Sequence, residues 1–238
     1  MCGIIAVLQQ RPSRPAPDLD RVLRRLDDAV TRLRAIDLER DLAALTAIAD
    51  ELEALDGELR GPPGAAALLS APELAGAAAV EVRAAALERI LRHLEHSLDC
   101  GTVSWSSAEL EAGNAVLLRC KDVIWALGRD RPGTARGIAD LAAGSLDGSL
   151  PGICAFWAIE VALSALDRLE VRGRDSAGIH VLVDGHGLEL GDGDVAAELS
   201  RRGDRLFTDG SVRAAEGHLS FVYKAAAEIG ELGDNTPA

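Results

Sequence analysis

Cys2 is the residue of this chain whose position most directly suggests chemistry. Removal of Met1 would leave Cys2 with both a thiol and a free α-amine. An α-amine has an ordinary pKa of about 7.7–8.0 and a thiol one of about 8.5, so the amine can accept the thiol proton near neutral pH. One residue would then supply both the nucleophile and its general base. The alternative is that Cys2 is a small buried hydrophobic residue in an edge strand.

The residues around Cys2 predict the element that holds it. The run Met-Cys-Gly-Ile-Ile-Ala-Val-Leu, residues 1–8, is short and apolar. We expect it to be a strand that begins at the terminus. A proline-rich stretch follows at 11–17 and is typical of a linker.

A second segment could support the same chemistry. Residues 169–179 read Leu-Glu-Val-Arg-Gly-Arg-Asp-Ser-Ala-Gly-Ile. This run resembles the Leu-Glu-Tyr-Arg-Gly-Tyr-Asp-Ser-Ala-Gly-Ile signature of class II glutamine amidotransferases. Within that family it is most similar to the glutaminase half of the glutamine–fructose-6-phosphate aminotransferases, whose mature chains also begin Cys-Gly-Ile. The two matches occur in the family's order, although Val171 and Arg174 replace two tyrosines of the pattern.

The resemblance implies a role for each matched residue. Cys2, followed by Gly3, is the nucleophile that attacks the side-chain amide of glutamine. Arg172 matches the arginine that contacts the backbone of the catalytic cysteine, a task that suits the fixed donor directions of a guanidinium. The alternative for Arg172 is a helix-end arginine that satisfies terminal carbonyl groups.

The rest of the signature is expected to shape the turn. Gly173 and Gly178 match glycines that set the backbone. Asp175 and Ser176 are expected to brace the turn rather than to touch substrate. An Asp-Ser pair can satisfy local backbone donors whatever the function of the protein.

The implied fold is α+β, a partial αββα N-terminal nucleophile hydrolase fold with a large all-helical insertion. The implied reaction hydrolyses glutamine to glutamate and passes ammonia to a sugar phosphate, converting fructose 6-phosphate to glucosamine 6-phosphate without a cofactor. The family's Thr-Arg-Trp-Ala strand and its oxyanion-binding Asn-Gly pair do not occur after Ile179. Gly113-Asn114 lies inside a predicted helix and does not replace that pair. The chain therefore resembles the front portion of an amidotransferase, either truncated or part of a split enzyme that needs downstream amidotransferase and sugar-phosphate isomerase domains. The competing hypothesis is a catalytically incompetent regulatory or scaffolding protein that acts through its helical insertion.

Three segments are predicted along the chain. Residues 1–17 form the first strand and linker, 18–150 a helical insertion built as a four-helix bundle, and 151–238 an incomplete continuation of the glutaminase domain. Apolar periodicity predicts helices at 18–60, 72–98, 106–127 and 134–146. Within the first, the register slips between Ile36 and Leu38, which indicates a kink or a shift in the packing partner. Residues 61–64, Gly-Pro-Pro-Gly, predict a turn.

Pattern also predicts the elements of the last segment. We expect a helix at 153–170, a strand at 177–183, and a hairpin turn at 184–187 that joins this strand to 188–190. Helices are expected at 195–202 and 221–232.

The composition of the chain limits the kinds of partner and binding site that it is expected to have. The net charge of −13 and the absence of a basic block argue against nucleic-acid binding. The four cysteines have no short paired spacing, which argues against a disulfide framework or a zinc knuckle. His93, His96 and Cys100 lack an evident fourth metal ligand, and residues 191–194 lack the length of a calcium loop. No leader or 18-residue apolar stretch was recognised, so a cytoplasmic protein without membrane contact is expected. Homo-oligomerisation is left open.

Overall fold

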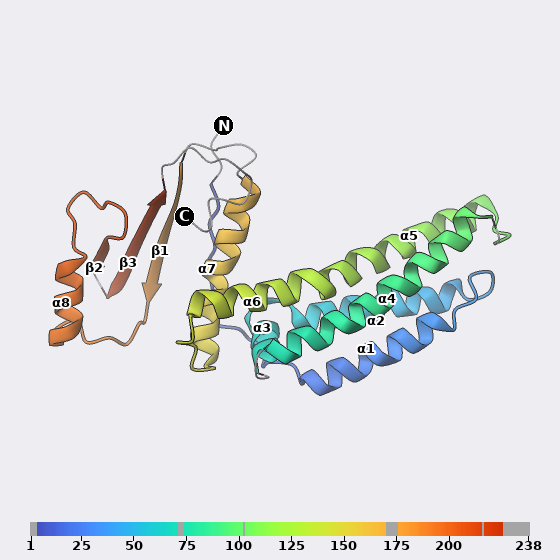
Figure 1. Ribbon diagram of the computed structural model, residues 1–238, viewed down its shortest axis with the longest axis horizontal. Coiled ribbons are helices and arrows are strands. Elements are labelled where there is room, and N and C mark those ends of the chain that lie inside the picture. Colours follow the sequence, from blue (N-terminus) through green and yellow to red (C-terminus); the bar gives the residue numbers. More distant parts are fainter. Residues whose placement is uncertain (1–3, 71–73, 102, 170–175, 216, 226–238) are drawn as a thin grey trace. The chain divides into compact units, whose positions relative to one another are not determined.

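The computed structural model describes residues 4–70, 74–101, 103–169, 176–215 and 217–225. The fold is α+β, with many helices and a small antiparallel sheet (Figure 1). The chain divides into two compact units. One comprises residues 9–157, and the other combines residues 4–8 with the chain from Ala158 onward.

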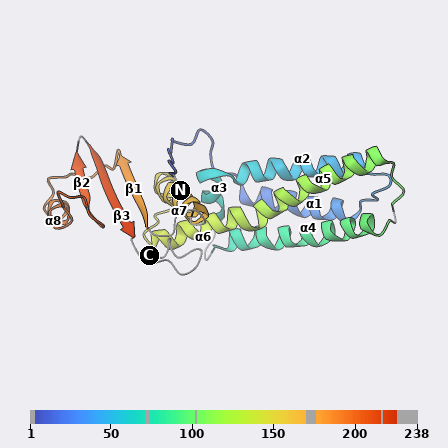
Figure 2. The ribbon, with the colours of Figure 1, turned by 90° about the horizontal axis from the view of Figure 1, so that it is seen from above.

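Four long helices form the core of the first unit. They are α1 (Leu19–Arg34), α2 (Leu42–Leu59), α4 (Ala75–Asp99) and α5 (Ser107–Trp125). α1 packs on α2 and α4, and α5 packs on the same two helices, so the four lie side by side (Figures 1 and 2). Their inward residues are mainly leucine, valine, isoleucine and alanine, as a chain with 3% aromatic residues requires.

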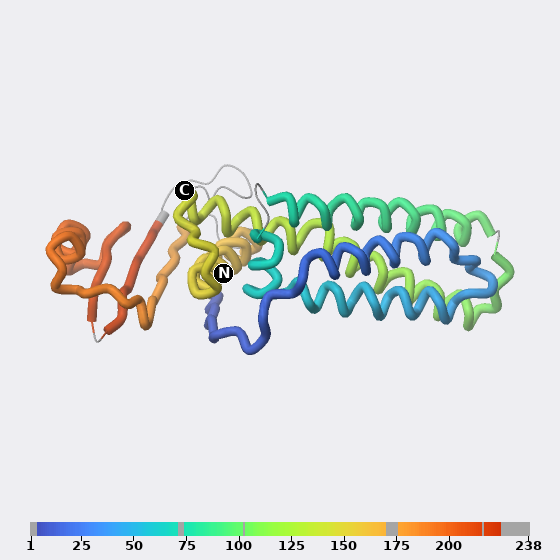
Figure 3. Tube along the Cα trace, turned by 90° about the horizontal axis from the view of Figure 1, so that it is seen from below, coloured from blue at the N-terminus to red at the C-terminus, as the bar shows by residue number. Residues whose placement is uncertain are grey.

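The single helix expected over 18–60 is wrong. α1 ends at Arg34, and the chain reverses through residues 35–41 before α2 begins (Figure 3). In this turn the Asp41 carboxylate accepts from the Asp37 backbone N–H, and the Asp37 carboxylate accepts from Glu39. These local bonds replace helical ones, and the buried Leu38 returns the chain to the core. The slip in the apolar register therefore marks a helix end.

The turn predicted at residues 61–64 is the start of a helix instead. α3 runs Gly61–Leu69, with prolines in its first turn. Proline fits there because its missing N–H would have no helical partner. Gly64 allows the close approach to α2, since a Cβ at this position would lie 2.0 Å from the Leu59 carbonyl oxygen.

The third and fourth predicted helices are joined into one continuous stretch. Ser106 caps α5, because its side chain accepts from the Glu109 N–H while the Glu109 carboxylate accepts from the Ser106 N–H. A π-helical turn, Ala126–Asp130, then leads directly into α6 (Arg131–Ala142). The serine cap was expected from the sequence, but the continuity through residues 126–130 was not.

α7 (Leu150–Leu169) is the helix expected at 153–170, and it extends from the first unit into the second. Its early residue Ile153 packs with Ala65 and Ile138 in the first unit. Among the described residues, α7 is also the helix that meets the length and hydropathy of a membrane span, with a mean hydropathy of 1.5 and 6% of that stretch buried. The expectation that no stretch has this composition does not hold, although the core helix of a soluble protein can meet the same criterion.

The second unit contains a three-stranded antiparallel sheet in the order β1-β3-β2. The strands are β1 (Ala177–Asp184), β2 (Val212–Ala215) and β3 (His218–Ala225), and α8 (Gly193–Arg201) lies between β1 and β2 in sequence. The expected strand at 177–183 and the helix at 195–202 are thus present. Ser211 and Val222 extend the pairing beside β2, where the Val222 N–H donates to the Ser211 carbonyl.

Three expectations about this unit are wrong. Residues 4–8 form no strand, and Ile4 and Leu8 are each 94% exposed. β1 pairs with β3, not with 188–190. The helix expected from Phe221 is replaced by β3 as far as residue 225, because cross-strand partners decide the conformation of a short apolar run. The described residues contain this one sheet, and the finer αββα arrangement remains a prediction.

Candidate functional site

The six residues assigned to the site by the sequence fall mostly outside the described part of the chain. Cys2, Gly3, Arg172, Gly173 and Asp175 lie outside it, so their mutual geometry stays a prediction. Ser176 is described, and it is exposed immediately before β1. The last three residues of the signature, 177–179, are thus the first residues of a strand, as the sequence predicts.

β1 carries two different faces. Its odd-numbered residues Ile179, Val181 and Val183 are half-buried, and its even-numbered residues are exposed. The cross-strand partners of the odd-numbered face are Tyr223, Phe221 and Leu219 of β3. This face therefore spans both strands, with Leu219 buried at 5% exposure and Tyr223 44% exposed.

Gly178 does not need to be glycine for a backbone reason. Its φ lies outside the left-handed region, since it is absent from the positive-φ glycines of the described chain. A Cβ there would lie 3.4 Å from the Tyr223 carbonyl oxygen and 3.8 Å from Lys224 Cγ, which are ordinary contacts. The expectation that this glycine sets the backbone is therefore wrong for the described conformation.

A polar pair that the sequence did not indicate lies on the other face of the sheet. His180 Nε2 and Ser220 Oγ are 2.7 Å apart, and the Phe207 ring meets the His180 ring edge-on at 5.8 Å. Arg213 stacks on the same Phe207 ring, with its guanidinium carbon 4.0 Å from the ring centre. A serine beside a histidine has the elements of an activated nucleophile. No carboxylate among the described residues forms a hydrogen bond or ion pair with His180, so the pair is a cross-strand hydrogen bond. The two residues meet only because of the β1–β3 register, which the local sequence pattern of either strand does not determine.

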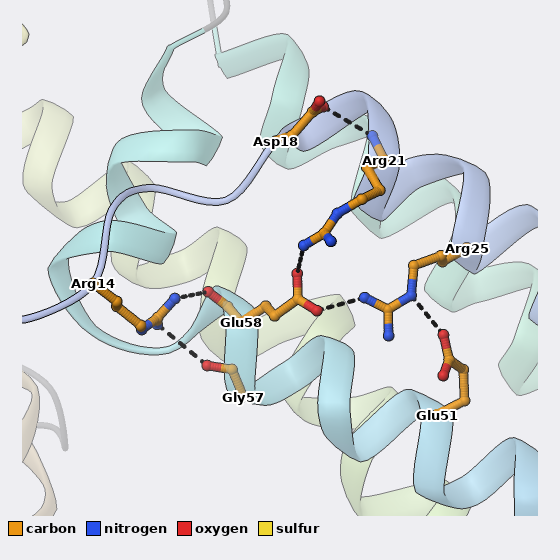
Figure 4. Close-up of polar contacts among 7 residues, drawn as sticks. All are labelled: Arg14, Asp18, Arg21, Arg25, Glu51, Gly57 and Glu58. Atoms are coloured by element: carbon orange, nitrogen blue, oxygen red, sulfur yellow. Dashed lines mark hydrogen bonds and ion pairs between the residues drawn. The ribbon is translucent and has the colours of Figure 1, made fainter.

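The linker before the bundle is fixed by Arg14 (Figure 4). Its guanidinium donates to the backbone carbonyls of Glu58 at 2.7 Å and Gly57 at 3.2 Å, and also to that of Arg60. These carbonyls lie at the C-terminal end of α2, where helical acceptors lack partners. A cation is favourable there because the helix dipole is negative at this end.

Glu58 and Glu51 of α2 hold α1 beside them (Figure 4). Arg21 donates to Glu58 at 2.8 Å, and Arg25 donates to Glu51 at 2.6 Å and also to Glu58. The hydrogen bond from Arg25 lowers the pKa of the Glu51 carboxyl and the bond from Glu51 raises the pKa of Arg25. This network is structural, since all four charged groups bind one another.

The buried charge of the bundle is Asp56, which is 1% exposed. Arg131 donates to its two carboxylate oxygens at 2.8 and 3.2 Å, and Arg60 donates at 2.7 Å. Arg131 directly follows the π-helical turn. The site is a paired structural carboxylate, because its oxygens are already engaged by two guanidinium groups.

The cysteines and histidines of the described chain do not form a metal centre. No group of three or more metal-ligating side chains is found among the residues described. His93 and His96 are exposed, as expected, and Cys100 Sγ lies 3.5 Å from a His96 ring nitrogen. Burial raises the pKa of the Cys120 thiol to about 11, so this cysteine is protonated and inert at neutral pH.

Two further sequence interpretations concern turns and glycines. Asp192 caps α8 by accepting from the Asp194 backbone at 3.0 Å, which agrees with a turn in place of a calcium loop. Gly113 is buried in α5, where a Cβ would lie 2.2 Å from the Trp105 ring. Its role in the described structure is packing against Trp105, and it lies in a helix as the sequence predicts.

Comparisons of the chain with profiles of known protein families, with characterised proteins and with solved structures gave no match.

Proposed function

We propose that this chain is the glutaminase portion of a class II glutamine amidotransferase and acts with further polypeptide that completes its pocket. The observation that carries the proposal is the sequence pair formed by Cys2-Gly3-Ile4 and the run Leu169–Ile179. The division of the chain adds support. Residues 4–8 group with the chain from Ala158 onward, and residues 9–157 form a unit of their own. This is the division expected if a helical insertion interrupts a glutaminase domain.

The proposed chemistry begins at Cys2. Its α-amine accepts the thiol proton, and the thiolate attacks the side-chain amide carbon of glutamine. A carbon–sulfur bond forms, the C–N bond breaks, and the proton held by the amine leaves with the nitrogen as ammonia. Water then hydrolyses the thioester to glutamate and regenerates the thiol. Arg172 positions the nucleophile by holding the backbone beside it.

The oxyanion of this reaction needs donors, and the Asn-Gly pair that supplies them in the family does not occur after Ile179. Each missing donor costs about 3–4 kcal/mol of transition-state stabilisation. The 238-residue chain alone is therefore expected to release little or no ammonia. Addition of the polypeptide encoded downstream, with its Thr-Arg-Trp strand and Asn-Gly pair, is expected to restore glutamate production, and glucosamine 6-phosphate is the product expected with fructose 6-phosphate as acceptor.

The test measures glutamate formed from glutamine by the chain with its downstream polypeptide. Cys2→Ala is expected to abolish activity, whereas the matched variant Cys100→Ala, which removes an exposed thiol directly after α4, retains it. Intact-mass measurement should show Met1 removed in the active protein. Activity that survives Cys2→Ala, or a protein that retains Met1 and is still active, would refute the proposed nucleophile.

A second candidate function is regulation or scaffolding through residues 9–157. The observation in its favour is that these residues form a compact unit with its own apolar core. Expressed alone, this segment should be helical and melt cooperatively. An inactive reconstituted pair in which this segment still folds would favour the second function over the first.

A further inference from the structure

One end of the helical bundle carries Arg14 and α3, and the other end carries a groove. At the connected end, Arg14 binds the C-terminal end of α2, and Ile153 packs with Ala65 of α3. At the opposite end, the turn at residues 35–41 meets the chain after α4, where Ser104 donates to Glu39 and Trp105 donates to the Leu38 carbonyl. α4 joins the two ends and has 25 residues, which corresponds to about 37 Å.

The groove at this far end has a volume of about 810 Å³. Buried leucines line its floor, from α1 (Leu33), the following turn (Leu38) and α4 (Leu94). The half-buried Ile36 and Ile90 extend this apolar lining. The volume is within the range of small-molecule sites, and the floor suits an alkyl chain.

The acidic and the basic residues at the rim of the groove differ in their partners within the protein. Asp37 pairs with Arg40 at 3.8 Å, and Asp37 and Glu39 accept backbone hydrogen bonds from Glu39 and Ser104 respectively. Arg34 and Arg89 also line the groove, and neither forms an ion pair within the described chain. Arg89 Nε donates to the Ala85 carbonyl at 3.3 Å, which leaves its two terminal amino groups for a ligand.

We propose that this groove binds an amphipathic anion, an alkyl chain that ends in a carboxylate or phosphate. The alkyl chain lies over the leucine floor, and Arg34 and Arg89 bind the anionic group through charge-assisted hydrogen bonds. His93 borders the same groove and adds a donor or acceptor to the rim. The ligand chemistry is shared by free fatty acids and by anionic lipids in a bilayer.

The test is titration calorimetry of the full chain with sodium decanoate, beside decanol as the uncharged analogue. Saturable binding of one decanoate per chain, at least tenfold tighter than decanol, is expected. The double variant Arg34→Gln/Arg89→Gln should weaken decanoate binding at least tenfold, because both cationic partners are lost. Arg92→Gln is the matched control, since Arg92 is exposed on the same helix and does not line the groove.

A second pair of variants tests the apolar floor. Ala86→Phe fills the groove and should abolish binding, whereas Val82→Phe, at an exposed position one turn earlier on α4, should not. Circular dichroism of each variant confirms that the helices are retained.

Flotation with phosphatidylglycerol vesicles distinguishes the source of the anion. Binding to vesicles that decanoate competes away assigns the anion to a lipid headgroup. Decanoate binding without vesicle binding assigns it to a free acid. Equal affinity for decanol and decanoate, unchanged affinity in the arginine double variant, or absence of binding to both probes would overturn the proposal.

Discussion

Replacement of Asp56 by alanine should be the most destabilising single change in the bundle that we can derive. The carboxylate is 1% exposed and binds Arg131, whose side chain is 19% exposed, and Arg60, whose side chain is 67% exposed. Without Asp56, Arg60 can return to water, but Arg131 remains partly buried and keeps only its longer ion pair with Asp130, at 3.8 Å. Breaking a buried pair in this way costs about 3–5 kcal/mol.

The assay is urea and thermal unfolding, followed by circular dichroism at a helical wavelength. For a protein of this size, 1 kcal/mol corresponds to about 2–4 °C, so Asp56→Ala should lower the melting temperature by about 6–20 °C. Glu53→Ala is the control, because Glu53 forms an exposed ion pair with Arg119 that is expected to contribute less than about 1 kcal/mol.

A double variant tests the cause of the loss. Asp56→Leu combined with Arg131→Met removes both charges of the buried pair and keeps side-chain volume. It should recover most of the stability, since the cost arises from the unpaired charge. A loss below about 1 kcal/mol for Asp56→Ala, or a double variant no more stable than Asp56→Ala, would refute this reasoning.

Two further changes test how the bundle is held. Arg14→Ala should lower the free energy of unfolding by about 1–2 kcal/mol, because the carbonyls of Gly57, Glu58 and Arg60 at the end of α2 lose a charged donor. Arg11→Ala, at an exposed position, should change it by less than about 0.5 kcal/mol, and equal effects in urea unfolding would contradict the capping role. Gly113→Ala should lower the free energy of unfolding by about 1–3 kcal/mol and shift tryptophan fluorescence to the red, because the new Cβ displaces Trp105. Gly133→Ala is the control and should be neutral or stabilising, since a Cβ there has nothing within 4 Å. Unchanged fluorescence in Gly113→Ala would contradict the contact with Trp105.

Local chemistry was enough to predict most of the helices. The Ser106 cap, the apolar periodicity of α4 and the Asp192 turn each depend on residues a few positions apart. Helix formation uses such local contacts, so their pattern is visible in the sequence. The sequence also identifies Cys2 and the 169–179 signature, and the described structure adds only the exposed Ser176 and the strand after it.

Tertiary contacts decided what the pattern left ambiguous. The break at residues 35–41 depends on buried Leu38, and the conformation of residues 221–225 depends on their pairing with β1 and β2. The His180–Ser220 pair joins residues 40 positions apart, and the groove beside Arg34 and Arg89 joins the end of α1 to α4. Such features arise from packing and register between distant segments. The sequence contains the residues that form these features, but local patterns in it do not show which distant segments pack or pair together.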